Sequence, residues 1–237
     1  AARATQEILG EALERQIGNI SASNHLPSNR KEELMDQLIR AEIQRTVWEA
    51  ERRIKNTMYS ATTFSLARLV KMPDRSQHLY ITNVGDSRIY ILRDGILLRV
   101  TQDDNLLTDA LRSRRVTREE AVLVDQASDA DALPSHLQVY FRNRNLINRS
   151  VGTLKGDTIN VKRFVVLAGD RLVLASDGLT DQLKESVIKK YLLQAMDDRA
   201  TERTLQTAAD EMALRGTDPR AKPDDISVVV YTLDRTD

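Results

Sequence analysis

The 237-residue sequence predicts an α+β protein in which helices pack on antiparallel sheets. Two observations support this class. Residues 1–55 show helical periodicity, and a series of short apolar runs separated by turns begins near residue 62. Helices, then strands, then further helices and a returning strand are typical of layered α+β domains. The sequence has no internal repeat and no break in composition, so we expect residues 1–237 to form a single domain.

The N-terminal part predicts two amphipathic helices. In residues 1–17 the apolar side chains follow one helical stripe. Residues 19–30 carry Ser, Asn and Pro and are expected to form a loop. Residues 31–55 predict a longer second helix, whose last stretch is strongly charged and is therefore expected to face solvent.

Strands begin where the helical pattern stops. Four apolar runs predict an antiparallel meander over residues 64–70, 79–84, 88–92 and 96–100. Asp94-Gly95 lies between the last two runs and is a strong hairpin signal, because both residues tolerate positive φ.

The second half of the chain returns to mixed elements. Residues 105–111 predict a short helix, and Thr117 with Glu120 fits a capping box that opens another. The polar segment 128–138 is expected to be a mobile loop. The remaining expectations are strands at 158–164 and 171–175, helices at 184–196 and 201–214, and a last strand at 226–231.

The composition excludes several classes of function. Lys plus Arg and Asp plus Glu both number 35, so no basic excess is available for bulk attraction to nucleic acid. The absence of cysteine excludes disulfides, thiolate zinc sites and cysteine nucleophiles. No signal peptide is visible, and no apolar run approaches the roughly 20 residues that a membrane span needs. We therefore expect a cytoplasmic protein without a nucleic-acid partner.

Three aspartates stand at strand ends, where metal ligands are often placed. Asp177 follows the buried run 171–175 in a Ser-Asp-Gly turn, and its glycine would let another group approach closely. Asp86 follows the run 79–84, and Asp224 precedes the last strand. Carboxylate oxygens at such positions suit Mg²⁺ or Mn²⁺.

Simpler interpretations compete with a metal site. An Asp-Gly pair after a strand is most often only a turn. Asp86 could cap its turn and pair with Arg88, and Asp103 and Asp104 could cap the helix that follows them. Arg144 could contact a phosphoprotein or simply lie in a solvated loop.

Six short motifs follow one another along residues 83–227 of the chain. They are Asn83–Arg88 (VGDSR), Thr101–Asp104 (TxDH), Val116–Ala121 (ITxEEA), Arg144–Gly152 (RNxLTRALG), Ser176–Leu179 (SDGL) and Asp224–Ser227 (D-[ND]-I-[ST]). They resemble the motifs of the metal-dependent protein serine/threonine phosphatases of type 2C, and the order and spacing agree from Ala61 to Tyr231. Asp104 replaces the histidine of the family's TxDH motif.

The resemblance implies a four-layer α-β-β-α sandwich, in which two antiparallel sheets are flanked by helix pairs. It also implies a pair of Mn²⁺ or Mg²⁺ ions, with a possible third. By position, Asp177 and Asp224 would hold a core ion, and Asp86 would join Asp177 at the weaker third ion. Arg144 and Asn145 would belong to the flap that contacts substrate.

The implied activity is hydrolysis of phosphoserine and phosphothreonine by a metal-activated water. The substrates would be phosphoproteins, such as those of a serine/threonine kinase. The family's opening arginine-containing strand and its DGMGG hairpin, which supplies an aspartate that bridges both metals, have no counterpart in the printed sequence. A catalytically incomplete pseudophosphatase that acts as a binding or regulatory module is therefore the alternative. A third option is a sporulation-type branch of the fold, against which the RNxLTRALG-like segment argues.

Overall fold

The computed structural model describes residues 13–57, 60–127, 129–156, 158–194, 197–215 and 225–233. The chain divides into two compact units, each built from two stretches of sequence. Ala1–Thr82 and Val151–Leu167 form the first unit, and Asn83–Ser150 and Ala168–Asp237 form the second. That residues 1–237 act as one domain stays a prediction.

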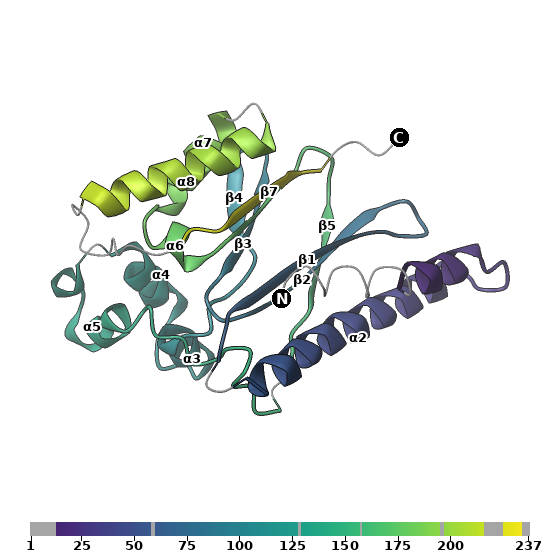
Figure 1. Cartoon of the computed structure of the whole chain (residues 1–237), viewed down its shortest axis with the longest axis horizontal. Coiled ribbons are helices and arrows are strands. Elements are labelled where there is room, and N and C mark those ends of the chain that lie inside the picture. The colour runs from purple at the N-terminus through teal and green to yellow at the C-terminus, as the bar shows by residue number, and fades with distance from the viewer. Residues whose placement is uncertain are drawn as a thin grey trace. The chain divides into compact units, whose positions relative to one another are not determined.

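The first unit is a three-stranded sheet with helices packed on it (Figure 1). Its strands run in the order β1-β2-β5, and β2 and β5 are antiparallel, with Leu79 opposite Phe164. The long helix α2 packs against this sheet, and residues 13–22 are also helical. The bounds are α2 Ser28–Lys55, β1 Phe64–Lys71, β2 Gln77–Val84 and β5 Lys162–Val166.

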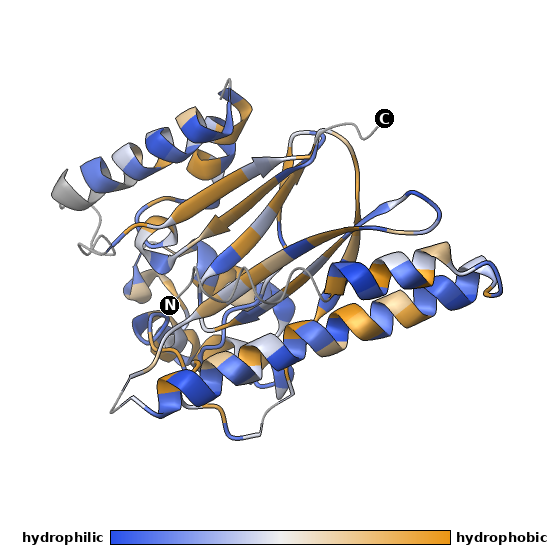
Figure 2. Ribbon diagram, turned by 45° about the vertical axis from the view of Figure 1, so that its right-hand side comes forward, coloured by the Kyte–Doolittle hydropathy of each residue, from blue (hydrophilic) through white to orange (hydrophobic). Residues whose placement is uncertain are grey.

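The core of the first unit follows from the amphipathic pattern of α2, which is visible as alternating hydropathy along the helix in Figure 2. Met35, Ile39 and Ile43 recur every four residues, so they share one helix face and are buried together. This face packs against sheet residues that include Val70 and Tyr80.

The second unit contains an antiparallel sheet of four strands in the order β4-β3-β6-β7 (Figure 1). Asp94 and Gly95 both have positive φ, which confirms the predicted hairpin between β3 and β4. Helices α7 and α8 cover the sheet around a core that includes Tyr90, Val173 and Leu205. The bounds are β3 Arg88–Arg93, β4 Ile96–Arg99, β6 Arg171–Ala175, β7 Val228–Thr232, α7 Glu185–Gln194 and α8 Asp198–Arg215.

Three further helices of the second unit form a small cluster of their own, built around Leu137 and Phe141 among others. The expected capping box is confirmed, because the Thr117 hydroxyl accepts from the Glu120 N–H and the Glu120 carboxylate accepts from the Thr117 N–H. The elements are α3 Leu106–Arg112, α4 Arg118–Gln126, the 3₁₀ turn η1 Ala130–Ala132 and α5 Ser135–Arg142.

Two local expectations were wrong. The segment 128–138 is not an irregular loop in its described part, because it contains η1 and the start of α5. Leu137 and Phe141 lie four residues apart and are both buried in the helical cluster, so their burial outweighs the polar local sequence. Residues 19–22 are helical rather than part of a loop, and residues 1–12 lie outside the described residues.

The α+β class with two antiparallel sheets, each carrying helices, is confirmed. The strands match the expected runs within a few residues, the largest difference being β5, which begins at Lys162 instead of residue 158. In the described part of the chain no helix combines the length and the apolar character needed to cross a membrane.

Candidate active site

A small cavity of about 80 Å³ in the second unit brings the predicted site residues together. Asp86, Asp177, Arg144 and Asn145 all line it, although they come from three separate stretches of sequence. Asp224 lies outside the described residues, so its predicted place beside Asp177 stays a prediction. We call this space the acidic cavity, because five of its lining residues are carboxylates, namely Asp86, Asp103, Asp125, Asp177 and Asp181.

Asp177 is positioned by the end of β6. The expected Ser-Asp-Gly turn is the start of a one-turn helix, α6 Asp177–Thr180, and the Asp177 carboxylate accepts from the Gly178 N–H at 3.0 Å. Gly178 has to be glycine, since a Cβ there would lie 2.4 Å from the Asp225 carbonyl oxygen. The expected close approach behind Asp177 is therefore real, and the approaching group is the chain that leads into β7.

Ser176, the residue before Asp177, also links the end of β6 to the segment that leads into β7. Its N–H donates to the Ser227 carbonyl at 2.9 Å, and the Ser227 N–H donates back to the Ser176 hydroxyl at 3.0 Å. The end of β6 and the start of β7 are thus held together just before Asp177. This arrangement places the described part of the last motif, residues 225–227, next to the SDGL motif in space.

Asp86 is half-buried in the turn after β2, among like charges. Burial, together with the charges of Asp177, Asp103 and Asp181, raises the pKa of its carboxyl to about 6. Several carboxylates that repel one another around one small space form a site that favours a bound cation.

The partner of Arg88 is Asp103, and not Asp86 as in the simpler interpretation of the sequence. Arg88 forms a bidentate ion pair with Asp103, with nitrogen–oxygen distances of 2.7 and 3.2 Å. Burial lowers the pKa of Arg88, but the charge of Asp103 outweighs this and raises it well above its ordinary value. The helix α3 is capped by Asn105, whose side chain accepts from the Thr108 N–H at 3.0 Å, so the alternative in which Asp103 or Asp104 caps this helix does not hold.

Arg144 is ordered at the wall of the acidic cavity. Its guanidinium lies 4.2 Å from the centre of the Phe141 ring, and it donates to the Phe141 carbonyl at 3.0 Å. The Arg144 carbonyl in turn accepts from the Asn105 side chain at 3.4 Å. A positive charge is therefore held beside a group of carboxylates, which suits recognition of an anion that is bound next to a cation.

Asp181 and Asp125 are carboxylates of the acidic cavity that the sequence analysis missed, and Asp181 is the one for which the sequence held a signal. It lies four residues after Asp177 and faces the same cavity, as side chains separated by one helical turn do. The i, i+4 spacing of two aspartates across the SDGL motif was the available signal. Its charge is one of those that raise the pKa of Asp86.

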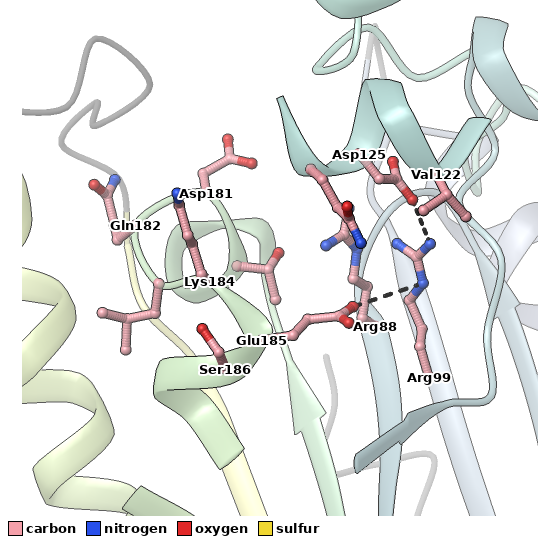
Figure 3. A pocket seen from close by; sticks show the side chains of 12 residues that line it. Arg88, Arg99, Val122, Asp125, Asp181, Gln182, Lys184, Glu185 and Ser186 are labelled. Atoms are coloured by element: carbon pink, nitrogen blue, oxygen red, sulfur yellow. Dashed lines mark hydrogen bonds and ion pairs between the residues drawn. The ribbon is translucent and has the colours of Figure 1, made fainter. Parts of the chain in front are cut away.

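A wider cavity of about 530 Å³ adjoins the acidic cavity and shares four lining residues with it, namely Arg88, Asp125, Thr180 and Asp181. Figure 3 shows Val122 and Asp125 of α4 on one side, and on the other Asp181, Gln182, Lys184 and Ser186. Arg99 stands between them and pairs with Asp125 at 2.6 Å and with Glu185 at 3.8 Å. This space is large enough to admit part of a peptide next to the acidic cavity.

The described residues are of the type that binds a divalent ion, but they do not supply enough ligands to form a metal site by themselves. Asp86 and Asp177 offer the carboxylate oxygens that hard cations prefer. Within the described residues, however, no three aspartate, glutamate or histidine side chains are grouped closely enough to hold a metal by themselves. The predicted additional ligand, Asp224, lies in the part that is not described.

Residues 1–213 match the family model for protein phosphatase 2C. The chain belongs to the protein phosphatase 2C family. Its members are metal-dependent serine/threonine protein phosphatases. This confirms the resemblance that the six motifs carried.

Known proteins agree with this assignment. Serine/threonine protein phosphatase PstP of Mycobacterium tuberculosis is 33% identical over 153 residues, which make up 64% of this chain and 24% of PstP. A serine/threonine phosphatase of S. agalactiae shares the fold with a TM-score of 0.61 and 23% identity, over 95% of this chain and 81% of its own. The catalytic domain of PstP, solved in complex with 2 manganese ions, gives a TM-score of 0.55 and 21% identity over 96% and 82% of the two chains.

Proposed function

We propose that this protein hydrolyses phosphoserine and phosphothreonine in phosphoproteins, including those made by a serine/threonine kinase. The observation that carries the proposal is the meeting of Asp86, Asp177, Arg144 and Asn145 around one acidic cavity. Family membership supports the reaction class. The cytoplasmic location and the absence of a nucleic-acid partner remain predictions from composition.

The proposed cofactor is a pair of Mn²⁺ or Mg²⁺ ions. Asp177 and Asp224 would hold a core ion, and Asp86 would join Asp177 at a third, weaker ion. When bound, such an ion lowers the pKa of its water and so supplies a nucleophile near neutral pH. Burial and the repulsion from neighbouring carboxylates raise the pKa of Asp86, and this supports the assignment, because a bound cation would relieve the repulsion.

The chain's own side chains would orient the substrate. Arg144, held against Phe141, presents a positive charge to a phosphoryl group, and Asn145 beside it can donate hydrogen bonds. The pairing of Arg88 with Asp103 removes one negative charge from the wall that an anionic substrate has to approach. The adjoining wider cavity has room for residues that flank the phosphorylated one.

The test is release of phosphate from a phosphothreonine peptide at several Mn²⁺ concentrations. In a chain that also carries the hairpin with the bridging aspartate, Asp177→Asn should lower turnover by at least about 100-fold, because an amide cannot supply the charge that stabilises the ion and its water. Asp94→Asn is the matched control, since it makes the same chemical change in the exposed hairpin turn between β3 and β4. Equal turnover by the wild type and Asp177→Asn would refute the assigned role of Asp177.

The sequence also predicts that residues 1–237 alone turn over slowly, because the hairpin with the bridging aspartate has no counterpart in them. A chain extended by any upstream coding residues that contain this hairpin should be faster. If the extended chain also shows no Mn²⁺-dependent turnover while it still binds phosphopeptide, the regulatory-module alternative becomes the better interpretation.

A further inference from the structure

Asp104 makes two hydrogen bonds to Gly85, the residue that precedes Asp86. Its buried carboxylate accepts a hydrogen bond from the Gly85 N–H at 3.1 Å. Its own backbone N–H donates to the Gly85 carbonyl at 2.9 Å. Gly85 has a φ of 100°, a conformation that favours glycine, and therefore forms a sharp turn after β2. Both hydrogen-bonding groups of this turn residue are thus engaged by one aspartate.

The same aspartate connects this turn to two other segments of the site. Arg112 of α3 and Arg149, which follows α5, approach its two carboxylate oxygens at 3.8 and 3.7 Å. The Asp104 carbonyl also accepts from the Asn148 N–H at 3.0 Å. Arg149 is the better-shielded of the two cations, since its side chain is 19% exposed against 54% for Arg112.

We propose that Asp104 is a positioning residue that fixes the Gly85 turn and thereby aims the Asp86 carboxylate into the acidic cavity. This inference rests on the proposed function, in which Asp86 is a ligand of a divalent ion. Asp104 would not touch the ion itself but would orient the ligand Asp86 through its hydrogen bonds to Gly85. Groups that orient a metal ligand from behind commonly change metal affinity by about 10- to 100-fold when they are lost.

The chemistry explains why an aspartate suits this position, where the related motif has histidine. A carboxylate accepts from the Gly85 N–H and balances Arg149 at the same time. A neutral imidazole can accept one hydrogen bond but leaves the arginine without its counter-charge, and a protonated imidazole can do neither. We therefore expect that Asp104→His does not restore the wild-type behaviour.

The experiment uses ¹⁵N-labelled residues 1–237 and two NMR readouts. The first is hydrogen exchange of the Gly85 amide, which tests the hydrogen bond itself. The second is paramagnetic broadening of the Asp86 amide during titration with Mn²⁺, which remains measurable when binding is weak. The variants are Asp104→Ala and Asp104→Asn. Asp109→Asn is the matched control, because Asp109 also pairs with Arg112, at 3.7 Å, but makes none of the hydrogen bonds to Gly85.

In Asp104→Ala we expect Gly85 exchange to accelerate at least about 10-fold and the Mn²⁺ midpoint to rise about 10-fold. In Asp104→Asn both changes should be smaller, since the amide oxygen still accepts from Gly85, and in Asp109→Asn both should be absent. If Asp104→Ala does not fold, Asp104→Asn decides by whether the two readouts change together: a Mn²⁺ midpoint that rises along with faster Gly85 exchange supports the inference, and an unchanged midpoint overturns it.

A purely structural role would accelerate Gly85 exchange and leave the Mn²⁺ midpoint within about twofold of the wild type, which would overturn the inference. Absence of any Mn²⁺ effect on the Asp86 amide of the wild-type chain would instead refute the assigned metal role of Asp86, and the positioning role with it. The two failures are therefore distinguishable.

Discussion

Replacing Asp86 by asparagine should stabilise the metal-free protein at neutral pH. Asp86 is half-buried, and burial together with the charges of Asp177, Asp103 and Asp181 raises the pKa of its carboxyl to about 6. The ionised form is therefore unfavourable in the folded chain. Asparagine has nearly the same shape and carries no charge, so it removes this penalty while it also removes a metal ligand.

The magnitude follows from the pKa. A rise from 3.8 to about 6 corresponds to roughly 3 kcal/mol, at about 1.4 kcal/mol for each tenfold change in the ionisation equilibrium. Because Asp86 retains contact with solvent, screening reduces this to roughly 1–2 kcal/mol. For a chain of this size that is a rise in Tm of roughly 2–8 °C.

The sign can be checked against pH. A carboxyl whose pKa is raised on folding binds more protons in the folded state between pH of about 4 and about 6, so the free energy of unfolding falls as pH rises through that window. The penalty is absent below about pH 4 and complete above about pH 6. The advantage of Asp86→Asn should therefore grow from pH 4 to pH 6 and then level off.

The assay is urea or thermal unfolding of the wild type and Asp86→Asn in EDTA between pH 4 and 8, with Asp94→Asn in the exposed hairpin as control. The reasoning fails if Asp86→Asn is less stable than the wild type at pH 7.5, or if the difference is the same at pH 4 and pH 7.5. Saturating Mn²⁺ should reverse the order, because a ligand that binds only the folded state stabilises the variant less.

Three substitutions test the packing that supports the site. Gly178→Ala should destabilise the chain by about 1–3 kcal/mol in urea unfolding, because the new Cβ would lie 2.4 Å from the Asp225 carbonyl; no loss would show that the segment before β7 relaxes freely. Gly18→Ala is its control and should stabilise by up to about 1 kcal/mol, since Gly18 is helical and nothing lies within 4 Å. Leu205→Ala in the fully buried core should cost about 2–5 kcal/mol in the same assay, and a cost below about 1 kcal/mol would contradict the packing of α8 on the sheet. Thr117→Ala should cost about 1 kcal/mol through loss of the capping box, measured as a lower Tm, whereas an unchanged Tm would mean that α4 does not depend on its cap.

The sequence alone determined what is local. The strands were readable because apolar runs are bounded by turn residues, and Asp94-Gly95 fixed its hairpin through the positive φ that both residues tolerate. Thr117 and Glu120 were readable as a cap because their hydrogen bonds span only three residues. Gly178 marked a close approach behind Asp177, although the sequence did not say which segment approaches.

The tertiary structure decided what depends on contacts between distant segments. Asp86, Asp177 and Arg144 share one cavity only because strand register and helix packing bring three separate stretches of sequence together. Arg88 pairs with Asp103 instead of Asp86, which is closer in sequence. The chain returns after β4 and places the Asp103 carboxylate within hydrogen-bonding distance of two guanidinium nitrogens. No periodicity in a sequence encodes such choices, since each depends on which groups the fold buries together and on the free energy of leaving a buried charge without its partner.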